Sequence, residues 1–217
     1  MGSLTDEQQT PDQLLARAAS GDAAAWGTLL TAHQERLTRM VTFRMDPRLR
    51  GRIDAADVVQ DAFVVASSHR DVYFRKPEVQ LFLWLRGVVI NKLLELHRHH
   101  LGTRMRDAKR ERSLEAPLRR DDTSAALCAY LTAGLTRPSV AAVRDEVTKR
   151  LAEALEAMDS TDREVLAMRH FEQLTNAEAA QVLGIQERAA AKRYLRALQR
   201  LKKILSEMPG GLTEVRL

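Results

Sequence analysis

The sequence lacks the features that mark several large classes of protein. Its single cysteine, Cys128, excludes an intramolecular disulfide framework and fits a reducing, cytoplasmic environment. No apolar run approaches the roughly 18 residues of a membrane span, since the most apolar stretch, 81–90, is interrupted by Arg86. The polar N-terminus does not resemble a signal peptide. We therefore expect no membrane insertion.

Motifs for enzyme chemistry are also absent. The chain has no phosphate-binding or dinucleotide-binding glycine loop, no HExxH zinc motif and no GxSxG elbow. The sequence therefore gives no motif in support of most nucleotide-dependent or hydrolytic enzyme classes. We predict that the protein is not an enzyme and has no catalytic residue, cofactor or metal.

Aromatic residues make up only 5% of the 217 residues, whereas Ala, Leu, Arg and Glu are abundant. This composition favours helices over a β-sandwich or barrel. Hydrophobic residues reach 45%, enough for a buried core in one large or two small domains. Lys and Arg number 34 against 29 Asp and Glu, and this excess is a first hint of a polyanionic partner.

Hydrophobic periodicity predicts an all-α protein with two small helical domains. Residues 113–142 lack the pattern and form a predicted flexible linker, with a short helical turn at 125–131. The predicted domains are 1–112 and 143–206, and 207–217 is a frayed tail. The predicted helices lie within 12–45 and at 55–69, 78–100, 143–158, 162–170, 176–183 and 187–206, with a loop at 71–77.

The C-terminal domain carries a helix-turn-helix pattern. Thr175 and Glu178 have the spacing of a capping box, and Gly184 follows the short helix at a left-handed turn position. The next helix is basic, because residues 186–203 hold seven Lys or Arg and one acidic residue. The arrangement predicts DNA contact by its N-terminal half. Those contacts are Arg188, Lys192, Arg193 and Arg196, and the predicted core side is Leu195, Leu198, Leu201 and Leu205.

A second pattern places three carboxylates, Asp54, Asp57 and Asp61, on one side of the helix at 55–69. Metal ligation or acid–base catalysis is one interpretation. The other is that they are helix-start carboxylates favoured by the helix dipole.

A third pattern joins an aromatic loop, 73–75, to a basic helix. Residues 86–112 hold eight Lys or Arg against three acidic residues. Cations beside aromatic rings suit single-stranded nucleic acid, although Trp84 is better interpreted as a core anchor. His97 and His100 have the spacing of a chelating pair, but a basic helix end is the preferred interpretation.

Taken together, these three blocks resemble a bacterial RNA polymerase sigma factor of the extracytoplasmic-function group. DAADVVQDAF at 54–63 is similar to the segment that docks on the polymerase clamp helices. FLWLRGVVINKLLELHR at 82–98 resembles the helix that recognises and opens the −10 promoter element. Residues 163–185 and the basic helix after them resemble the domain that reads the −35 element.

The resemblance implies a transcription initiation factor whose partners are core polymerase, through the clamp helices of its largest subunit, and promoter DNA. Family members are often held by an anti-sigma protein, so an anti-sigma protein or another regulator is also expected. The implied polymerase contacts are Asp57, Val58, Gln60, Asp61 and Phe63. The implied −10 contacts are Phe74, Arg75, Lys76, Arg86, Asn91, Lys92 and Arg98, and the implied −35 contacts are the four basic residues named above.

The chain departs from the family pattern at several positions. Gln186 replaces the usual Ser or Thr cap of the recognition helix, which predicts weaker capping. Ala189 to Ala191 and Glu95 are also atypical. Two other functions remain open at this point. One is a stand-alone helix-turn-helix regulator, and the other is a metal-dependent nuclease that uses Asp54, Asp57, Asp61 and a histidine.

Overall fold

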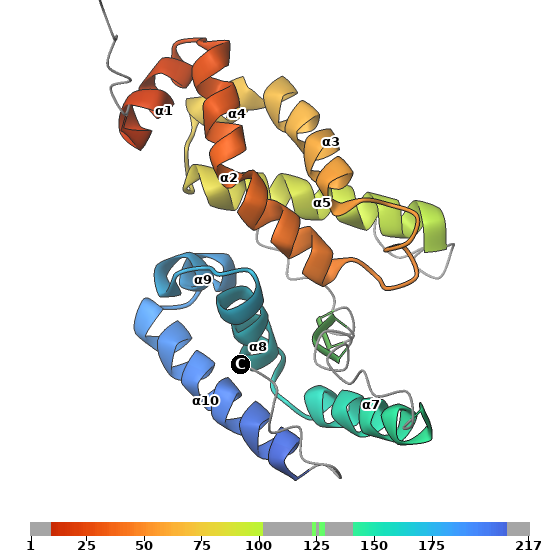
Figure 1. Ribbon diagram of the computed structural model, residues 1–217. Coiled ribbons are helices and arrows are strands. Elements are labelled where there is room, and N and C mark those ends of the chain that lie inside the picture. Colours follow the sequence, from red (N-terminus) through yellow and green to blue (C-terminus); the bar gives the residue numbers. More distant parts are fainter. Residues whose placement is uncertain (1–9, 102–122, 125, 129–140, 208–217) are drawn as a thin grey trace, which may run out of the picture.

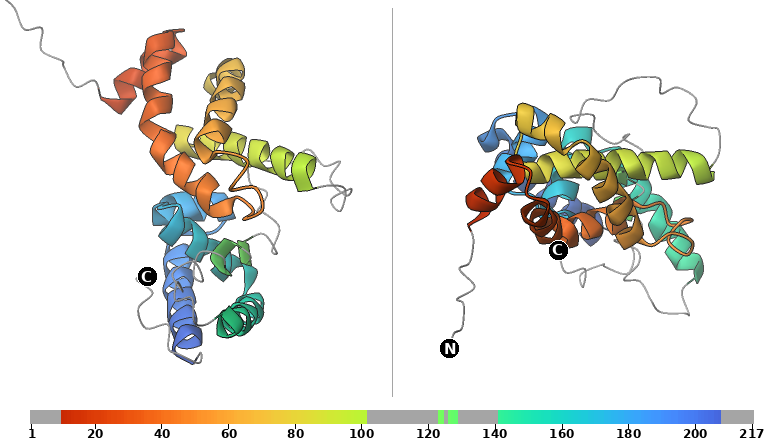
Figure 2. Two further views of the ribbon diagram at one scale, coloured as in Figure 1. Left: turned by 45° about the vertical axis from the view of Figure 1, so that its right-hand side comes forward. Right: turned by 90° about the horizontal axis from the view of Figure 1, so that it is seen from above.

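The computed structural model describes residues 10–101, 123–124, 126–128 and 141–207. Every regular element within these ranges is a helix, which confirms the predicted all-α class. Figures 1 and 2 show two groups of helices, α1 to α5 and α7 to α10, and buried side chains from both groups share one core cluster. The two small helical domains are therefore confirmed, and they are packed together rather than held apart.

Two long helices, α2 and α5, and three shorter ones build the described part of the N-terminal domain. Asp22 and Asp54 are N-caps: Asp22 accepts from the Ala24 and Ala25 N–H groups, and Asp54 accepts from the Ala56 N–H. Leu37, Leu85 and Leu93 are fully buried where α2, α3 and α5 meet. The helices are α1 (Pro11–Ala19), α2 (Ala23–Arg44), α3 (Ala55–Ser68), α4 (Arg70–Arg75) and α5 (Leu81–Leu101).

The predicted loop at 71–77 is wrong in part, because 70–75 form the short helix α4. Its aromatic side chains explain the difference. Tyr73 is buried and lies 5.0 Å from Trp84 between ring centroids, and Phe74 meets Trp26 edge-on at 5.9 Å. These contacts hold the segment against the core. Trp84 is a core anchor, as predicted.

The C-terminal domain differs from prediction at its second helix. The expected helix at 162–170 begins at the N-cap Asp159, which accepts from Thr161 and Asp162, and changes to a π-helical turn at Ala167. The elements are α7 (Ala141–Glu156), α8 (Ser160–Leu166), the π-helical turn η2 (Ala167–Phe171), α9 (Asn176–Leu183) and α10 (Glu187–Ser206).

The helix-turn-helix is confirmed in detail. The Thr175 hydroxyl accepts from the Glu178 N–H, and the Glu178 carboxylate accepts from the Thr175 N–H, which completes the capping box. Gly184 ends α9 at φ 63°, a left-handed conformation that favours glycine. Ala190, Ala197 and Leu201 bury the inner side of α10.

Part of the predicted linker belongs to the C-terminal core. Residues 126–128 are helical, as predicted for the turn at 125–131, and Leu127 is fully buried among C-terminal residues. The Cys128 thiol donates to the Thr148 carbonyl at 3.4 Å, and burial raises its pKa. Predictions on 102–122, on 129–140 and on the tail from 208 lie outside the described residues.

The two cores are continuous across the domain contact. Met168, Leu174 and Ala179 of the C-terminal domain are buried together with N-terminal residues. Conversely, Phe43 of α2 is buried among C-terminal residues. In Figure 2 the end of α2 reaches the turn between α8 and α9. We call this packed state the closed arrangement.

Candidate nucleic-acid and partner interfaces

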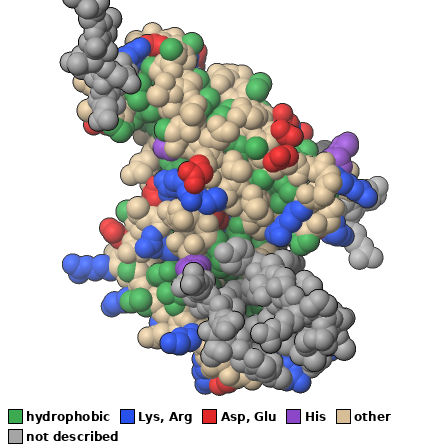
Figure 3. All heavy atoms as spheres, viewed as in Figure 1, with side chains coloured by type: hydrophobic (Ala, Val, Ile, Leu, Met, Phe, Trp, Pro, Cys, Tyr) green, Lys and Arg blue, Asp and Glu red, His purple; other side chains and the backbone are tan. Residues whose placement is uncertain are grey.

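The outer face of α10 is basic and free of intradomain packing. Arg188, Lys192 and Arg196 are exposed at helical spacing. Figure 3 shows Lys and Arg side chains projecting at the edge of the molecule where α10 begins. This face meets the requirement for an α-helix in a major groove, where cations contact phosphates and base edges.

Leu195 lies on the same outer face and is 59% exposed, so its predicted place in the core is wrong. The helical period explains this, because positions 188, 192 and 195 share one side of α10. An exposed leucine between cationic side chains offers an apolar contact to the edge of a base pair.

The fourth predicted −35 residue, Arg193, faces its own domain. Its guanidinium pairs with Asp162 at 3.0 Å and with Asp159 at 3.3 Å, both at the start of α8. These ion pairs tie α10 to α8. Arg193 is thus a positioning residue in this arrangement, unlike the three outward cations.

The predicted polymerase-docking segment presents carboxylates and aliphatic side chains together. Asp57, Gln60 and Asp61 are exposed on α3. Val64 follows them and is 72% exposed, although it was not predicted as a contact. Acidic side chains gather over this side of the N-terminal domain in Figure 3. A mixed acidic and apolar surface of this kind suits a protein partner.

Two of the predicted docking residues are not on that surface. Val58 and Phe63 are 1% and 7% exposed and belong to the N-terminal core. They lie on the inner side of α3, which packs against α2 and α5. Their prediction as surface contacts is wrong because the same period that exposes Asp57 and Asp61 turns them inward.

Most of the predicted −10 residues lie at the surface. Arg75, Lys76, Asn91 and Arg98 are exposed, and Phe74 is half-buried in the aromatic cluster. Some of the cations already have partners. Lys76 pairs with Glu78, and Lys92 lies 3.4 Å from the Asp61 carboxylate of α3.

Arg86 is the exception, because it is 4% exposed. Its Nε donates to the Glu172 carboxylate of the C-terminal domain at 2.8 Å. Contact between Arg86 and a promoter strand is therefore incompatible with the closed arrangement. The role of Arg86 at the −10 strand stays a prediction that requires the C-terminal domain to move away from this part of α5.

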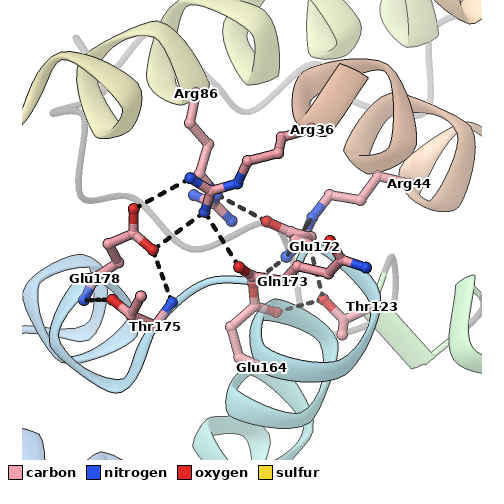
Figure 4. Close-up of polar contacts among 9 residues, drawn as sticks. All are labelled: Arg36, Arg44, Arg86, Thr123, Glu164, Glu172, Gln173, Thr175 and Glu178. Carbon is pink, nitrogen blue, oxygen red and sulfur yellow. Dashed lines mark hydrogen bonds and ion pairs between the residues drawn. The ribbon is translucent and has the colours of Figure 1, made fainter. Parts of the chain in front are cut away.

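A buried charge cluster joins the two domains at this point (Figure 4). Glu172 accepts from Arg44 through one carboxylate oxygen and from Arg86 through the other. Arg44 also donates to Glu164 at 2.6 Å. The Thr123 hydroxyl donates to the second oxygen of Glu164 at 2.6 Å. The sequence interpretation missed all of these residues except Arg86.

A second ion pair flanks this cluster. Arg36 of α2 donates to the Glu178 carboxylate at 3.1 Å and to the Gln173 carbonyl at 3.2 Å. Its guanidinium lies 3.6 Å from the centre of the Phe82 ring, a cation–π contact. Gln173 has φ 58°, which is unusual for a residue other than glycine, and thereby aims its carbonyl at Arg36.

The electrostatics keep these groups ionised. Burial raises the pKa of Glu172, but the charges of Arg44 and Arg86 outweigh it and hold the pKa below its usual value. Burial likewise opposes the charge on Arg44, yet Glu164 and Glu172 raise its pKa. The pKa of Glu178 is lowered, since the Thr175 N–H and Arg36 outweigh its desolvation. These groups are therefore charged and paired in the closed arrangement at neutral pH.

Neither a metal site nor a membrane span was found in the part of the chain that the structure describes. No three His, Cys, Asp or Glu side chains there are placed to hold an ion. No helix among those residues combines the length and apolar character needed to cross a bilayer.

Comparison with known proteins identifies the family. Residues 148–201, which include the helix-turn-helix, match the family model described as sigma-70, region 4. The chain is 30% identical over 198 residues to the RNA polymerase sigma factor CnrH of Cupriavidus metallidurans, covering 88% of this chain and 92% of that protein. The chain belongs to the RNA polymerase sigma factor family.

Other comparisons extend along both domains of this sigma factor. It is 24% identical over 206 residues to the RNA polymerase sigma-H factor of Pseudomonas aeruginosa, covering 94% of this chain and 97% of that one. A solved structure of CnrH in complex with the cytosolic domain of CnrY is 27% identical, with a TM-score of 0.49 over 89% of this chain and 95% of that one.

This sigma factor is a transcription initiation factor of the extracytoplasmic-function group. The stand-alone helix-turn-helix regulator is not favoured, because the relatives align with both domains and all three are RNA polymerase sigma factors.

Proposed function

We propose that this sigma factor docks on core RNA polymerase through α3 and reads the two elements of a promoter with its two domains. The outward face of α10 carries the proposal. Arg188, Lys192 and Arg196 project from one side of the second helix of a capped helix-turn-helix, with Leu195 between them. In the proposed complex this face enters the major groove of the −35 duplex.

The docking contact uses the exposed side of α3. Asp57 and Asp61 offer carboxylates, and Gln60 and Val64 extend the surface with an amide and an aliphatic side chain. The proposed acceptor is the pair of clamp helices of the largest polymerase subunit. Charged groups steer the encounter, and the apolar contact holds the complex.

The −10 element is captured as a single strand. The aromatic cluster, with Phe74 at its edge, stands beside the exposed cations Arg75 and Lys76 at the end of α4, and the exposed Asn91 and Arg98 lie on α5. Because unpaired bases bind there and paired bases do not, binding shifts the DNA toward the melted state. Because the two DNA-binding domains are covalently linked, binding of one at its promoter element raises the effective concentration of the other at its own element.

Regulation by a protein partner completes the proposal. Sigma factors of this group are often held by anti-sigma proteins, and such a partner would bind the exposed surfaces of α3 and α10.

The test is run-off transcription on genomic fragments with core polymerase. We expect promoter-dependent transcripts with the full chain. The Arg196→Ala variant should lower them, and Lys149→Ala, which removes one exposed cation from α7, should not. Absence of any promoter-dependent transcript from an active core would refute the proposal.

A further inference from the structure

Among the described residues, three arginines of the N-terminal domain pair with carboxylates of the other domain and with none of their own. Arg36 and Arg44 project from α2 and Arg86 from α5. In the part of the chain that the structure describes, their ion pairs run to Glu178, to Glu164 and Glu172, and to Glu172, respectively. Figure 4 shows the arginines converging on these acidic side chains.

The spacing of the guanidinium groups matches one small anion. Arg44 and Arg86 occupy the two oxygens of a single carboxylate, that of Glu172. Two cations this close repel one another unless an anion lies between them. A phosphodiester offers the same pair of oxygens, and the planar fork of arginine binds phosphate and carboxylate in the same way.

The cluster is costly to leave unpaired. Arg44 and Glu172 are 2% and 0% exposed in their side chains, and removing one partner from a buried pair leaves an uncompensated charge. When the domains separate, the arginines lose all three carboxylates at once. Either water or another polyanion then has to solvate them.

The position of the cluster indicates which polyanion would pair with the arginines after the domains separate. Arg86 lies on α5, five residues before Asn91, on the helix proposed to hold the −10 strand. Arg36 is braced on the Phe82 ring of the same helix. Five residues rotate Arg86 and Asn91 by about 140° around α5, so the three guanidinium groups would extend the proposed −10 surface onto another side of this helix once the domains separate.

We infer that Arg36, Arg44 and Arg86 form a binding site for the phosphate backbone of DNA, and that the C-terminal domain masks this site with Glu164, Glu172 and Glu178 in the closed arrangement. The inference rests on the proposed function and extends it. The carboxylates compete with phosphates in cis, so DNA binding at this site and separation of the domains favour one another.

The test measures binding of the full chain to a fluorescein-labelled single-stranded DNA of arbitrary sequence over a series of salt concentrations. Glu172→Gln removes the central carboxylate. Glu153→Gln removes an exposed carboxylate from α7 and is the matched control. We expect Glu172→Gln to bind about tenfold more tightly at low salt. Its log–log salt slope should steepen by about 0.7 for each phosphate gained.

Domain separation is followed independently by energy transfer between dyes on cysteines at the exposed positions Ser68 and Gln199, in a Cys128→Ser background. Adding Arg44→Gln and Arg86→Gln to the Glu172→Gln variant should abolish the gain in affinity and slope. If Glu172→Gln does not separate the domains, Glu172→Arg, which places a like charge against both arginines, replaces it in both measurements.

Domain separation without a gain in DNA affinity would overturn the inference. A gain that survives loss of the arginines, or a closed state in both Glu172 variants, would overturn it too. A gain in core polymerase affinity alone would assign the site to a protein surface instead. Because the probe contains no promoter, these outcomes are separate from failure of run-off transcription.

Discussion

Phe43, near the end of α2, stacks face to face on Phe171 in the π-helical turn, with ring centroids 4.6 Å apart and planes 4° from parallel. One ring belongs to each domain, and both are buried in the C-terminal cluster. The closed arrangement thus has an apolar contact beside the charged one. Phe43 serves the contact between domains rather than the core of its own.

Replacing Phe43 by alanine should therefore separate the domains without unfolding the N-terminal one. The change removes the stacked ring and its buried surface, and truncating a buried phenylalanine to alanine typically costs about 3–5 kcal/mol. Energy transfer between the Ser68 and Gln199 dyes should fall. Val41→Ala is the contrast, because Val41 is buried in the N-terminal core. It should lower the melting temperature of that domain and leave the energy transfer unchanged.

Acid should open the closed arrangement. The pKa of Glu172 lies below its usual value of 4.5 when the domains are closed, since Arg44 and Arg86 outweigh the effect of burial. On separation the pKa returns toward that value, so the separated state binds more protons. The stabilisation is complete above pH 4.5 and is lost as the pH falls below it. We expect energy transfer to decrease over that range.

The reference for the acid experiment is Glu172→Gln, which lacks the titrating group. His33 also faces the contact beside Arg36, and burial lowers its pKa, while Glu178 titrates there as well. Because Glu172→Gln is expected to be open at neutral pH already, its energy transfer should start low and change little as the pH falls. A pH dependence of the same size in Glu172→Gln would show that Glu172 is not responsible.

The two sides of α3 should respond differently to substitution. Asp61→Lys and Val64→Asp change exposed side chains, so we expect a loss of core polymerase affinity with little change in the free energy of unfolding. Phe63→Ala changes a core residue and should cost about 3–5 kcal/mol of stability. Titration with core polymerase and chemical denaturation measure the two effects. Wild-type affinity in Asp61→Lys would refute the docking surface.

Features that depend on only a few neighbouring residues could be predicted from the sequence. The capping box at Thr175 and the left-handed Gly184 follow from hydrogen bonding and backbone sterics within a few residues, and both were predicted correctly. The family resemblance added the order of the three functional blocks. It did so without showing which side chains within each block reach the surface.

The predictions that were wrong depend on packing between residues that lie far apart in the sequence. Val58 and Phe63 were assigned to a partner because the motif was treated as a unit, whereas the helical period buries them. Arg44 and Arg86 are cations on the buried sides of otherwise apolar helix segments, a pattern that indicates a charged partner without saying where it lies. Glu172 comes from the other domain, and no local rule connects it to them.

The start of α10 offers the last prediction. Its N-cap is Gln186, whose side chain makes no capping hydrogen bond, as its departure from the usual Ser or Thr predicts. Gln186→Ser should place a hydroxyl where it can accept from the N–H groups of the first turn, and stabilise the domain by about 1 kcal/mol. Gln186→Ala is the control, because it shortens the side chain without adding an acceptor. Thermal unfolding of the full chain compares the two variants. Equal melting temperatures would mean that another group already accepts from the first-turn N–H groups of α10.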